Sequence, residues 1–167
     1  VEEMKQDTQI RTIAELVPPD VHTSLFIGCG SGDEMSIVAA KESRIGLDLS
    51  LYGLKIAKSR RNGCNFILGD ACNIPFKSGS FDLIVCSEVI EHLDSPRKAV
   101  SEIARALHVN GSAIISSPNL ASLFGFFRAV AEFFSRRAVT AAGQLIDNWV
   151  TSTSLKKLVQ NDFTVLN

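Results

Sequence analysis

The first residues along the chain that could support chemistry are three closely spaced glycines. Gly28, Gly30 and Gly32 alternate with other residues in the stretch LFIGCGSG. Glycine adopts backbone angles that are closed to other residues, so such a turn lets a ligand approach the main chain. Asp48 follows Gly28 by 20 residues, at the end of a second apolar run. A carboxylate at this spacing is typical of a site that accepts hydrogen bonds from both hydroxyls of a ribose. The pattern therefore predicts a nucleoside site.

The residues around the glycines indicate which kind of nucleoside this is. A dinucleotide site has a further glycine where Asp33 stands, and an acid at the start of a helix repels a pyrophosphate. The phosphate-loop pattern G-x-x-x-x-G-K-[ST] is absent from the sequence. Asp70 and Ala71 follow a third apolar run, where a carboxylate could accept a hydrogen bond from an adenine amino group. The sequence favours an adenosine ligand without phosphates.

Apolar runs alternate with helical patterns along the chain. Strands are predicted over 23–28, 43–50, 64–70, 80–88, 111–117 and 162–167, and helices over 3–17, 34–42, 51–61, 95–107 and 151–161. This alternation indicates crossover connections and a parallel sheet covered on both faces. Ligands of such sheets bind beyond the carboxyl ends of the strands. We predict a single α/β domain over 1–167 with a Rossmann-like, doubly wound, mostly parallel sheet.

Residues 119–150 interrupt the alternation and are too long for a plain loop. We predict a helical insertion after the fifth strand. Its phenylalanines could form an apolar lid over the site, or they could be the core face of ordinary helices. Contact with a membrane surface or with a second copy of the chain through 119–137 is a further hypothesis.

Five stretches resemble, in order, the motifs of class I S-adenosylmethionine-dependent methyltransferases. They read IGCGSG, IGLDLS, LGDACNIPF, FDLIVCSEVIEHL and NGSAIISSPN, and together they span roughly residues 22–119. The resemblance implies S-adenosylmethionine as the cofactor. It assigns to that cofactor Gly28, Cys29 and Gly30 at the methionyl part, Asp48 at the ribose, Leu49, Asp70 and Ala71 at the adenine, and Ser87 near the sulfonium.

Phe26 departs from the family pattern, which commonly carries an acid two residues before the first glycine. That acid often helps to organise the ammonium end of the cofactor, which a phenylalanine cannot do. Asp33 or Glu34 could replace it from the other side of the loop. The hypothesis is that the cofactor still binds, with a weaker hold on its methionyl end.

The resemblance implies methyl transfer to a small-molecule, lipid-like or saccharide acceptor. A base is needed where the acceptor must lose a proton, and the candidates are Glu88, Glu91 and His92, which all follow the fourth strand closely. We place Glu88 and His92 first, and any of the three could instead cap or pack a helix. A non-catalytic S-adenosylmethionine-binding regulatory or scaffold subunit is the alternative function. A nicotinamide-linked dehydrogenase is disfavoured by the glycine spacing.

Composition limits the partners. A formal net charge of −1 argues against a nucleic-acid partner. The 4 cysteines show neither zinc-ligand nor C-x-x-C spacing, so we expect no metal and four free thiols.

The first residues do not resemble a signal peptide, and no apolar run reaches the roughly 18 residues of a membrane span. We expect a cytoplasmic location, and a sheet that is incomplete at its carboxyl-terminal end because the family's seventh strand is missing.

Overall fold

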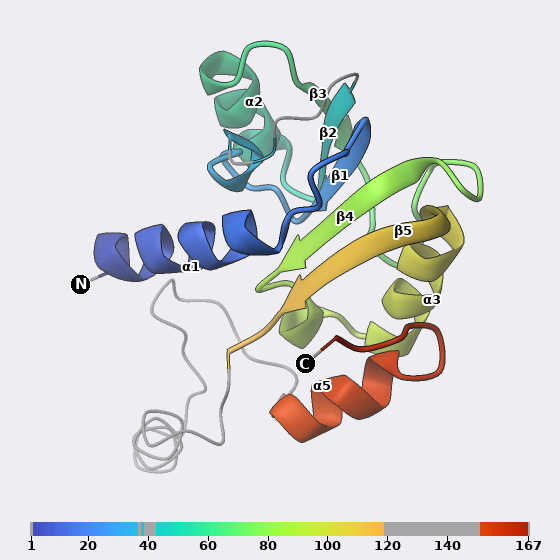
Figure 1. Ribbon diagram of the computed structural model, residues 1–167. Helices are drawn as coiled ribbons and strands as arrows, with labels where there is room; N and C mark the ends of the chain where they lie inside the picture. The colour runs from blue at the N-terminus through green and yellow to red at the C-terminus, as the bar shows by residue number, and fades with distance from the viewer. Residues whose placement is uncertain (1, 37, 39–42, 119–150, 167) are drawn as a thin grey trace.

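A five-stranded, wholly parallel sheet forms the centre of the molecule (Figure 1). The computed structural model describes residues 2–36, 38, 43–118 and 151–166. The strands are β1 (Thr23–Ile27), β2 (Ser43–Asp48), β3 (Asn65–Leu68), β4 (Phe81–Ser87) and β5 (Leu107–Ser116). Their spatial order is β3-β2-β1-β4-β5, so the order reverses between β1 and β4. This arrangement confirms the predicted Rossmann-like sheet.

Helices connect and flank the strands. They are α1 (Glu2–Leu16), α2 (Leu51–Arg60), α3 (Pro96–Ala106) and α5 (Ser152–Val159), with short 3₁₀ turns η1 (Glu34–Ser36) and η2 (Ile90–His92). Figure 1 shows α2 beside β2 and β3, and α3 next to α5. Local sequence sets their starts: the Ser50 hydroxyl accepts a hydrogen bond from the Gly53 N–H at 3.1 Å, and Pro96 opens α3.

Two separate cores cover the two faces of the sheet. Leu25 and Ile27 of β1 belong to a core with α3 and with Val159 of α5. Phe26, between them, belongs to the second core, together with Ile13 of α1 and Met35 of η1. Successive residues of a strand point to opposite faces, so β1 contributes to both cores. The predicted covering of both faces is confirmed.

The predicted sixth strand is wrong for the part of 162–167 that the structure describes. The N–H groups of Asp162 and Phe163 both donate to the Val159 carbonyl at 3.0 Å, which continues α5 as a turn. Phe163 then packs against the first core. Residues 163–166 form no ladder, and Leu166 is 91% exposed. The N–H groups of Asp162 and Phe163 are used at the end of α5, so these two residues cannot donate them to a sheet edge.

Two other predictions need adjustment. β5 begins at Leu107, four residues earlier than expected, and it bulges: Phe81 faces Leu107, whereas Leu83 faces Ser112. Of the predicted helix 34–42, Glu34–Ser36 forms a 3₁₀ turn, and most of the remainder lies outside the described residues. The predicted insertion 119–150 also lies outside them.

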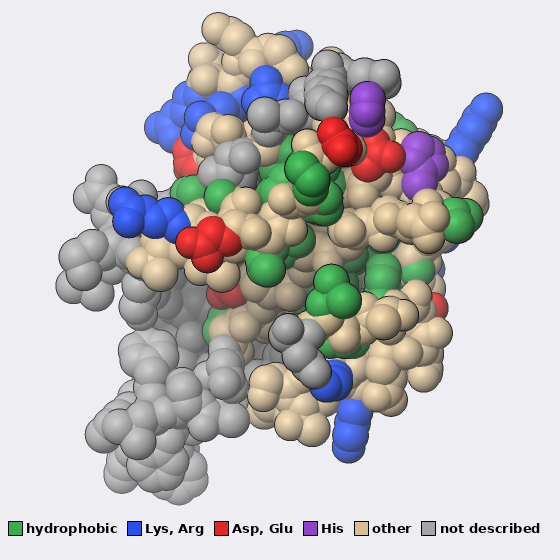
Figure 2. All heavy atoms as spheres, in the orientation of Figure 1, with side chains coloured by type: hydrophobic (Ala, Val, Ile, Leu, Met, Phe, Trp, Pro, Cys, Tyr) green, Lys and Arg blue, Asp and Glu red, His purple; other side chains and the backbone are tan. Residues whose placement is uncertain are grey.

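Asp82 joins three strands at the amino-terminal edge of the sheet. Its carboxylate accepts hydrogen bonds from the Thr23 N–H at 2.9 Å and from the His108 ring at 2.9 Å. A cavity of about 490 Å³ lies beside this pair, and Figure 2 shows acidic and histidine side chains gathered near the starts of β4 and β5.

Within the described ranges, no helix has the length and apolar character to cross a membrane.

Candidate functional site

The loop after β1 is built around left-handed glycines. Gly28 and Gly30 have φ angles of 67° and 49°. A Cβ atom on Gly28 would lie 2.2 Å from a methyl group of Val89, so no side chain fits there. A Cβ on Gly30 would meet no atom within 4 Å. The loop therefore packs tightly at Gly28 and leaves its main chain open to a ligand at Gly30.

Asp48 fixes this loop to the end of β2. One carboxylate oxygen accepts the Gly30 N–H at 2.8 Å, and the other accepts the Ser50 N–H at 2.7 Å. A carboxylate offers about four lone-pair positions, so these two donors leave capacity for ribose hydroxyls. The structure thus brings together the glycine loop and the acid that the sequence paired with it.

The residues predicted for the adenine lie at the neighbouring strand ends. Leu49, after β2, is 69% exposed and offers an apolar surface. Asp70, after β3, is exposed, and its carboxylate accepts the Cys72 N–H at 2.8 Å. The Ala71 side chain is buried in the first core, so this residue can meet a ligand only through its main chain.

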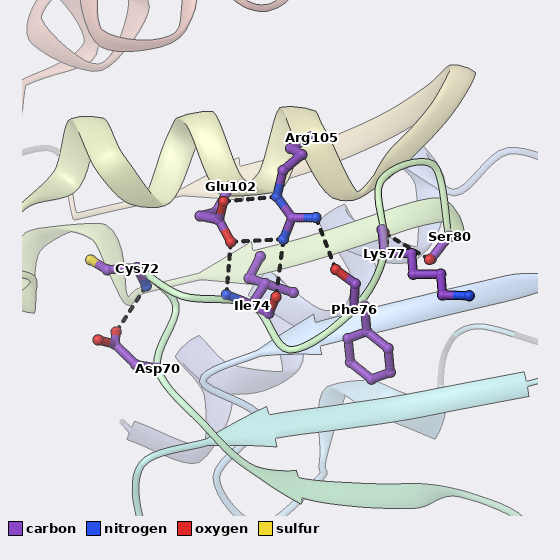
Figure 3. A network of polar contacts seen from close by, with 8 residues as sticks. All are labelled: Asp70, Cys72, Ile74, Phe76, Lys77, Ser80, Glu102 and Arg105. Carbon is purple, nitrogen blue, oxygen red and sulfur yellow. Dashed lines mark hydrogen bonds and ion pairs between the residues drawn. The ribbon is translucent and has the colours of Figure 1, made fainter.

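A network from α3, which the sequence motifs did not indicate, holds the connection between β3 and β4 (Figure 3). The Arg105 guanidinium donates to the carbonyls of Phe76 at 2.8 Å and Ile74 at 3.0 Å. Glu102 accepts the Ile74 N–H at 2.9 Å and pairs with Arg105 at 2.8 Å. The hydrogen bond from Arg105 lowers the pKa of Glu102, which keeps this carboxylate ionised. The i,i+3 spacing of the pair is visible in the sequence, but its partners in the loop are not.

Hydroxyl groups line the ends of β4 and β5. Ser87 and Ser116 are register partners, and their Oγ atoms lie 3.0 Å apart. Gln9 of α1 reaches this point, because its Nε2 donates to the Ser87 Oγ at 2.6 Å. Gln9 and Ser116 were not predicted as site residues. No local motif marks Gln9, whose place depends on how α1 packs against the sheet.

Glu88 follows directly after β4 in a strained conformation. Its φ of 54° lies in the left-handed region, which costs a residue other than glycine roughly 1–3 kcal/mol. Its N–H donates to the Ser116 carbonyl at 3.2 Å, and its carboxylate accepts the Ser116 hydroxyl at 3.2 Å. Strained residues of this kind are concentrated at functional sites.

Burial raises the pKa of Glu88 to about 7, and the neighbouring charges of Glu91 and Glu34 add to this rise. Burial also raises the pKa of Glu34 and of Glu91, whose side chain is 3% exposed. Three acidic side chains with raised pKa values therefore lie close enough to influence one another near the end of β4. Glu88 can exchange a proton near neutral pH.

His92, the second candidate base, is paired differently. Its Nε2 lies 3.8 Å from a carboxylate oxygen of Glu91. The structure therefore connects Glu88 to the serines and His92 to Glu91. In the part of the chain that the structure describes, no group of three or more His, Cys, Asp or Glu side chains could hold a metal ion.

The two acids that could replace the missing family acid have different surroundings. Asp33 accepts the Ser31 hydroxyl at 2.6 Å and pairs with Arg61 at 3.0 Å. One Glu34 carboxylate oxygen lies 3.5 Å from Gln9 Nε2, and the Ser87 hydroxyl acts to lower the Glu34 pKa. Glu34 is thus the acid that lies near Gln9 and near Ser87, the residue predicted beside the sulfonium.

Known methyltransferases resemble this chain in sequence. The family model of the methyltransferase domain matches residues 25–115. A demethylmenaquinone methyltransferase of Renibacterium salmoninarum is 35% identical over 58% of this chain and 40% of its own length. A ubiquinone/menaquinone biosynthesis C-methyltransferase of Campylobacter jejuni is 30% identical over 72% of this chain and 54% of its own length. The chain thus spans about half, or less, of the length of these relatives.

Solved structures agree on the fold. A SAM-dependent methyltransferase of Thermotoga maritima superposes with a TM-score of 0.75 at 22% identity, over 92% of this chain and 68% of that one. The family match covers the glycine loop, the ends of β2 and β3, and the turn after β4, which are parts of the candidate site. The chain therefore belongs to the methyltransferase domain family, with the class I S-adenosylmethionine-dependent fold that its five motifs predicted.

Proposed function

We propose that this chain transfers a methyl group from S-adenosylmethionine to a small, lipid-like acceptor. The observation that carries the proposal is the hydrogen bond between Gly30 and Asp48, which places an open glycine main chain beside a carboxylate at the carboxyl ends of β1 and β2, next to the point where the strand order reverses. Such a crevice is the ligand site of doubly wound sheets.

The described residues fit this cofactor. S-adenosylmethionine, when bound, supplies a methyl group on a positively charged sulfur. Gly28, Cys29 and Gly30 would hold the methionyl part by their main chain, and Asp48 would accept the ribose hydroxyls. Leu49, Asp70 and Ala71 would bind the adenine, and Ser87 would lie near the sulfur. Support comes from the open side of Gly30, the spare lone pairs of Asp48 and the exposed side chain of Leu49.

The names of the relatives support one acceptor for this chain, the ring of a reduced quinone with an apolar tail. Two of the relatives are named for methyl transfer in menaquinone or ubiquinone synthesis. This choice narrows the wider class of small-molecule, lipid-like or saccharide acceptors that the sequence predicted.

Methylation of a ring carbon requires a base, because that carbon must lose its hydrogen as a proton. Glu88 is the proposed base. It lies immediately after β4, it can be ionised near neutral pH, and the Ser116 hydroxyl orients its carboxylate. His92 is the less favoured candidate, because its described partner is Glu91. A deprotonated base is required, so activity should rise as the pH increases through about 7.

Two measurements test the proposal in order. Calorimetric titration of the purified chain with S-adenosylhomocysteine should show one site, and absence of heat at millimolar ligand would contradict cofactor binding. Mass spectrometry should then detect S-adenosylhomocysteine formed from S-adenosylmethionine and a short-tailed demethylated naphthoquinol. Binding without turnover across a panel of quinol, phenol and sugar acceptors would favour a non-catalytic S-adenosylmethionine-binding subunit.

The cellular setting is part of the proposal. Cys29, Cys64, Cys72 and Cys86 are all free thiols, which supports a reducing, cytoplasmic location. A contact with a second copy or with a membrane surface through 119–137 stays a hypothesis, because those residues lie outside the described part of the chain.

A further inference from the structure

A continuous chain of hydrogen bonds connects α1 to Glu88 across the ends of two strands. Gln9 Nε2 lies 2.6 Å from the Ser87 Oγ, and this atom lies 3.0 Å from the Ser116 Oγ. The Ser116 Oγ lies 3.2 Å from a Glu88 carboxylate oxygen. We refer to Gln9, Ser87 and Ser116 as the polar chain. Its first member comes from α1, which precedes the part of the sequence that the family model matches.

The direction of these hydrogen bonds follows from the chemistry of the groups. An amide nitrogen can only donate, so Ser87 accepts from Gln9 and its own hydrogen remains available. Ser116 donates its single hydrogen to Glu88, so at the contact between the two serines Ser87 is the donor and Ser116 the acceptor. The Ser87 hydroxyl also acts on the Glu34 carboxylate, whose pKa it lowers, so Ser87 divides its one hydrogen between Ser116 and Glu34. Hydrogen bonds in a row polarise one another, which strengthens the last one.

The polar chain and the neighbouring charges have opposite effects on the pKa of Glu88. The charged groups that face Glu88 are Glu91 of η2 and Glu34 of η1, and both disfavour a further negative charge. His92 neighbours Glu91 and partly offsets that charge. The Ser116 hydroxyl is the described partner that lowers the Glu88 pKa. A donor to the charged form is therefore the means by which this site keeps its base usable at neutral pH.

We propose that Gln9, Ser87 and Ser116 are positioning residues, and that their hydrogen bonds orient Glu88 and hold its carboxylate ready to take a proton from the acceptor. This inference rests on the proposed function, in which Glu88 is the base. It adds a role for Gln9 of α1, which precedes the five motifs, and for Ser116, the last residue of β5, to which the resemblance assigned no role.

Carbon NMR of the chain with ¹³C-labelled glutamate carboxyls tests the proposal without any acceptor. The signal of Glu88 is assigned by its loss in Glu88→Gln, and its titration midpoint is followed from pH 5 to 9. The midpoint should lie near 7 in the wild type and rise by about one pH unit in Ser116→Ala. Ser116→Thr retains the hydroxyl and should restore the wild-type value.

Two further variants make the test specific. Ser112→Ala removes a hydroxyl from the same strand four residues earlier, and it should leave the midpoint unchanged. Gln9→Met keeps the side-chain volume but removes the donor, so it should raise the midpoint by less than Ser116→Ala does. If Ser116→Ala does not fold, Gln9→Met decides. Unchanged midpoints in the variants that fold, or an equal shift in Ser112→Ala, would overturn the proposal.

Kinetics separate this proposal from the proposed function. Ser116→Ala should shift the acidic limb of the pH profile of kcat/KM upward by the same amount as the NMR midpoint, with affinity for S-adenosylhomocysteine within about twofold of the wild type. A uniform loss of activity at every pH would indicate a structural role and overturn the inference. Full activity of Glu88→Gln at every pH would instead remove the base from the proposed function, whatever the titration shows.

Discussion

Phe26 of β1 and Val85 of β4 are register partners in the sheet, and each side chain is 1% exposed. Both lie in the second core, beside Ile13 of α1 and Met35 of η1. The residue that breaks the family pattern is therefore a core residue beneath the glycine loop. Glu34, on the other side of that loop, stays a predicted substitute for the family acid, and one of its carboxylate oxygens lies 3.5 Å from Gln9 Nε2.

Replacement of Phe26 should affect stability and leave the cofactor site nearly unchanged. Phe26→Ala should lower the free energy of unfolding by about 3–5 kcal/mol, because it leaves a cavity in a packed core. Phe26→Leu should lower it by less, with affinity for S-adenosylhomocysteine within about twofold of the wild type. Urea denaturation and calorimetric titration measure the two quantities. A tenfold loss of affinity in Phe26→Leu without loss of stability would place Phe26 in the site.

Asp48→Ala should weaken binding of S-adenosylhomocysteine by roughly 10–100-fold, the usual effect of losing hydrogen bonds to a charged group. The reason is the loss of both the ribose acceptor and the support of the Gly30 N–H. Calorimetric titration gives the affinity, and Asp94→Ala, at an exposed acid before α3, is the matched control.

A second ligand separates these two effects of Asp48. The wild type should bind adenosine more tightly than 2′,3′-dideoxyadenosine, and Asp48→Ala should bind the two equally. If the variant still distinguishes them as well as the wild type does, the ribose role belongs to another residue.

Arg105→Met should destabilise the chain by about 1–3 kcal/mol, because the carbonyls of Ile74 and Phe76 lose a charged donor. The double variant Glu102→Gln, Arg105→Met should cost less than the sum of the single variants, since the two side chains form one network (Figure 3). Urea denaturation provides the values, with Ser101→Ala, at an exposed position of the same helix, as the control. Strict additivity of the two substitutions would mean that they act independently.

The sequence was most informative where structure depends on neighbours along the chain. A strand followed by a glycine turn places Gly28 and Gly30 after the end of β1, and β2 ends at Asp48. Both positions follow from the local sequence and do not depend on contacts with distant segments. Their meeting at 2.8 Å follows from two parallel strands that end at one edge. This part of the site was therefore predictable from the order of elements.

Contacts between distant segments were not predictable in this way. Gln9 reaches Ser87 because Ile13 of α1 packs into the second core, and the sequence of α1 does not state which face of the sheet it will cover. The apolar run at the chain's carboxyl end was predicted as a strand from its composition. A strand exists only with a hydrogen-bonding neighbour, and the backbone of Phe163 is bonded to Val159 instead.

Asp82 should make stability depend on acid pH. The hydrogen bond from His108, followed by those from Thr23, lowers the pKa of Asp82 from 3.8 to about 2 in the folded chain. A carboxyl group with a lowered folded pKa contributes stability above its unfolded pKa and loses it as the pH falls toward the folded one. The contribution of Asp82 is thus complete above about pH 4 and is lost between about pH 4 and 2.

Asp82→Asn removes this titration while it keeps the size of the side chain. Urea denaturation from pH 2 to 6 should give the wild type a higher free energy of unfolding than Asp82→Asn above pH 4. This difference should shrink as the pH falls to 2. Asp94→Asn, an exposed acid, should leave the wild-type pH dependence unchanged. Parallel curves for the wild type and Asp82→Asn would show that the bonds from His108 and Thr23 do not favour the charged form of Asp82.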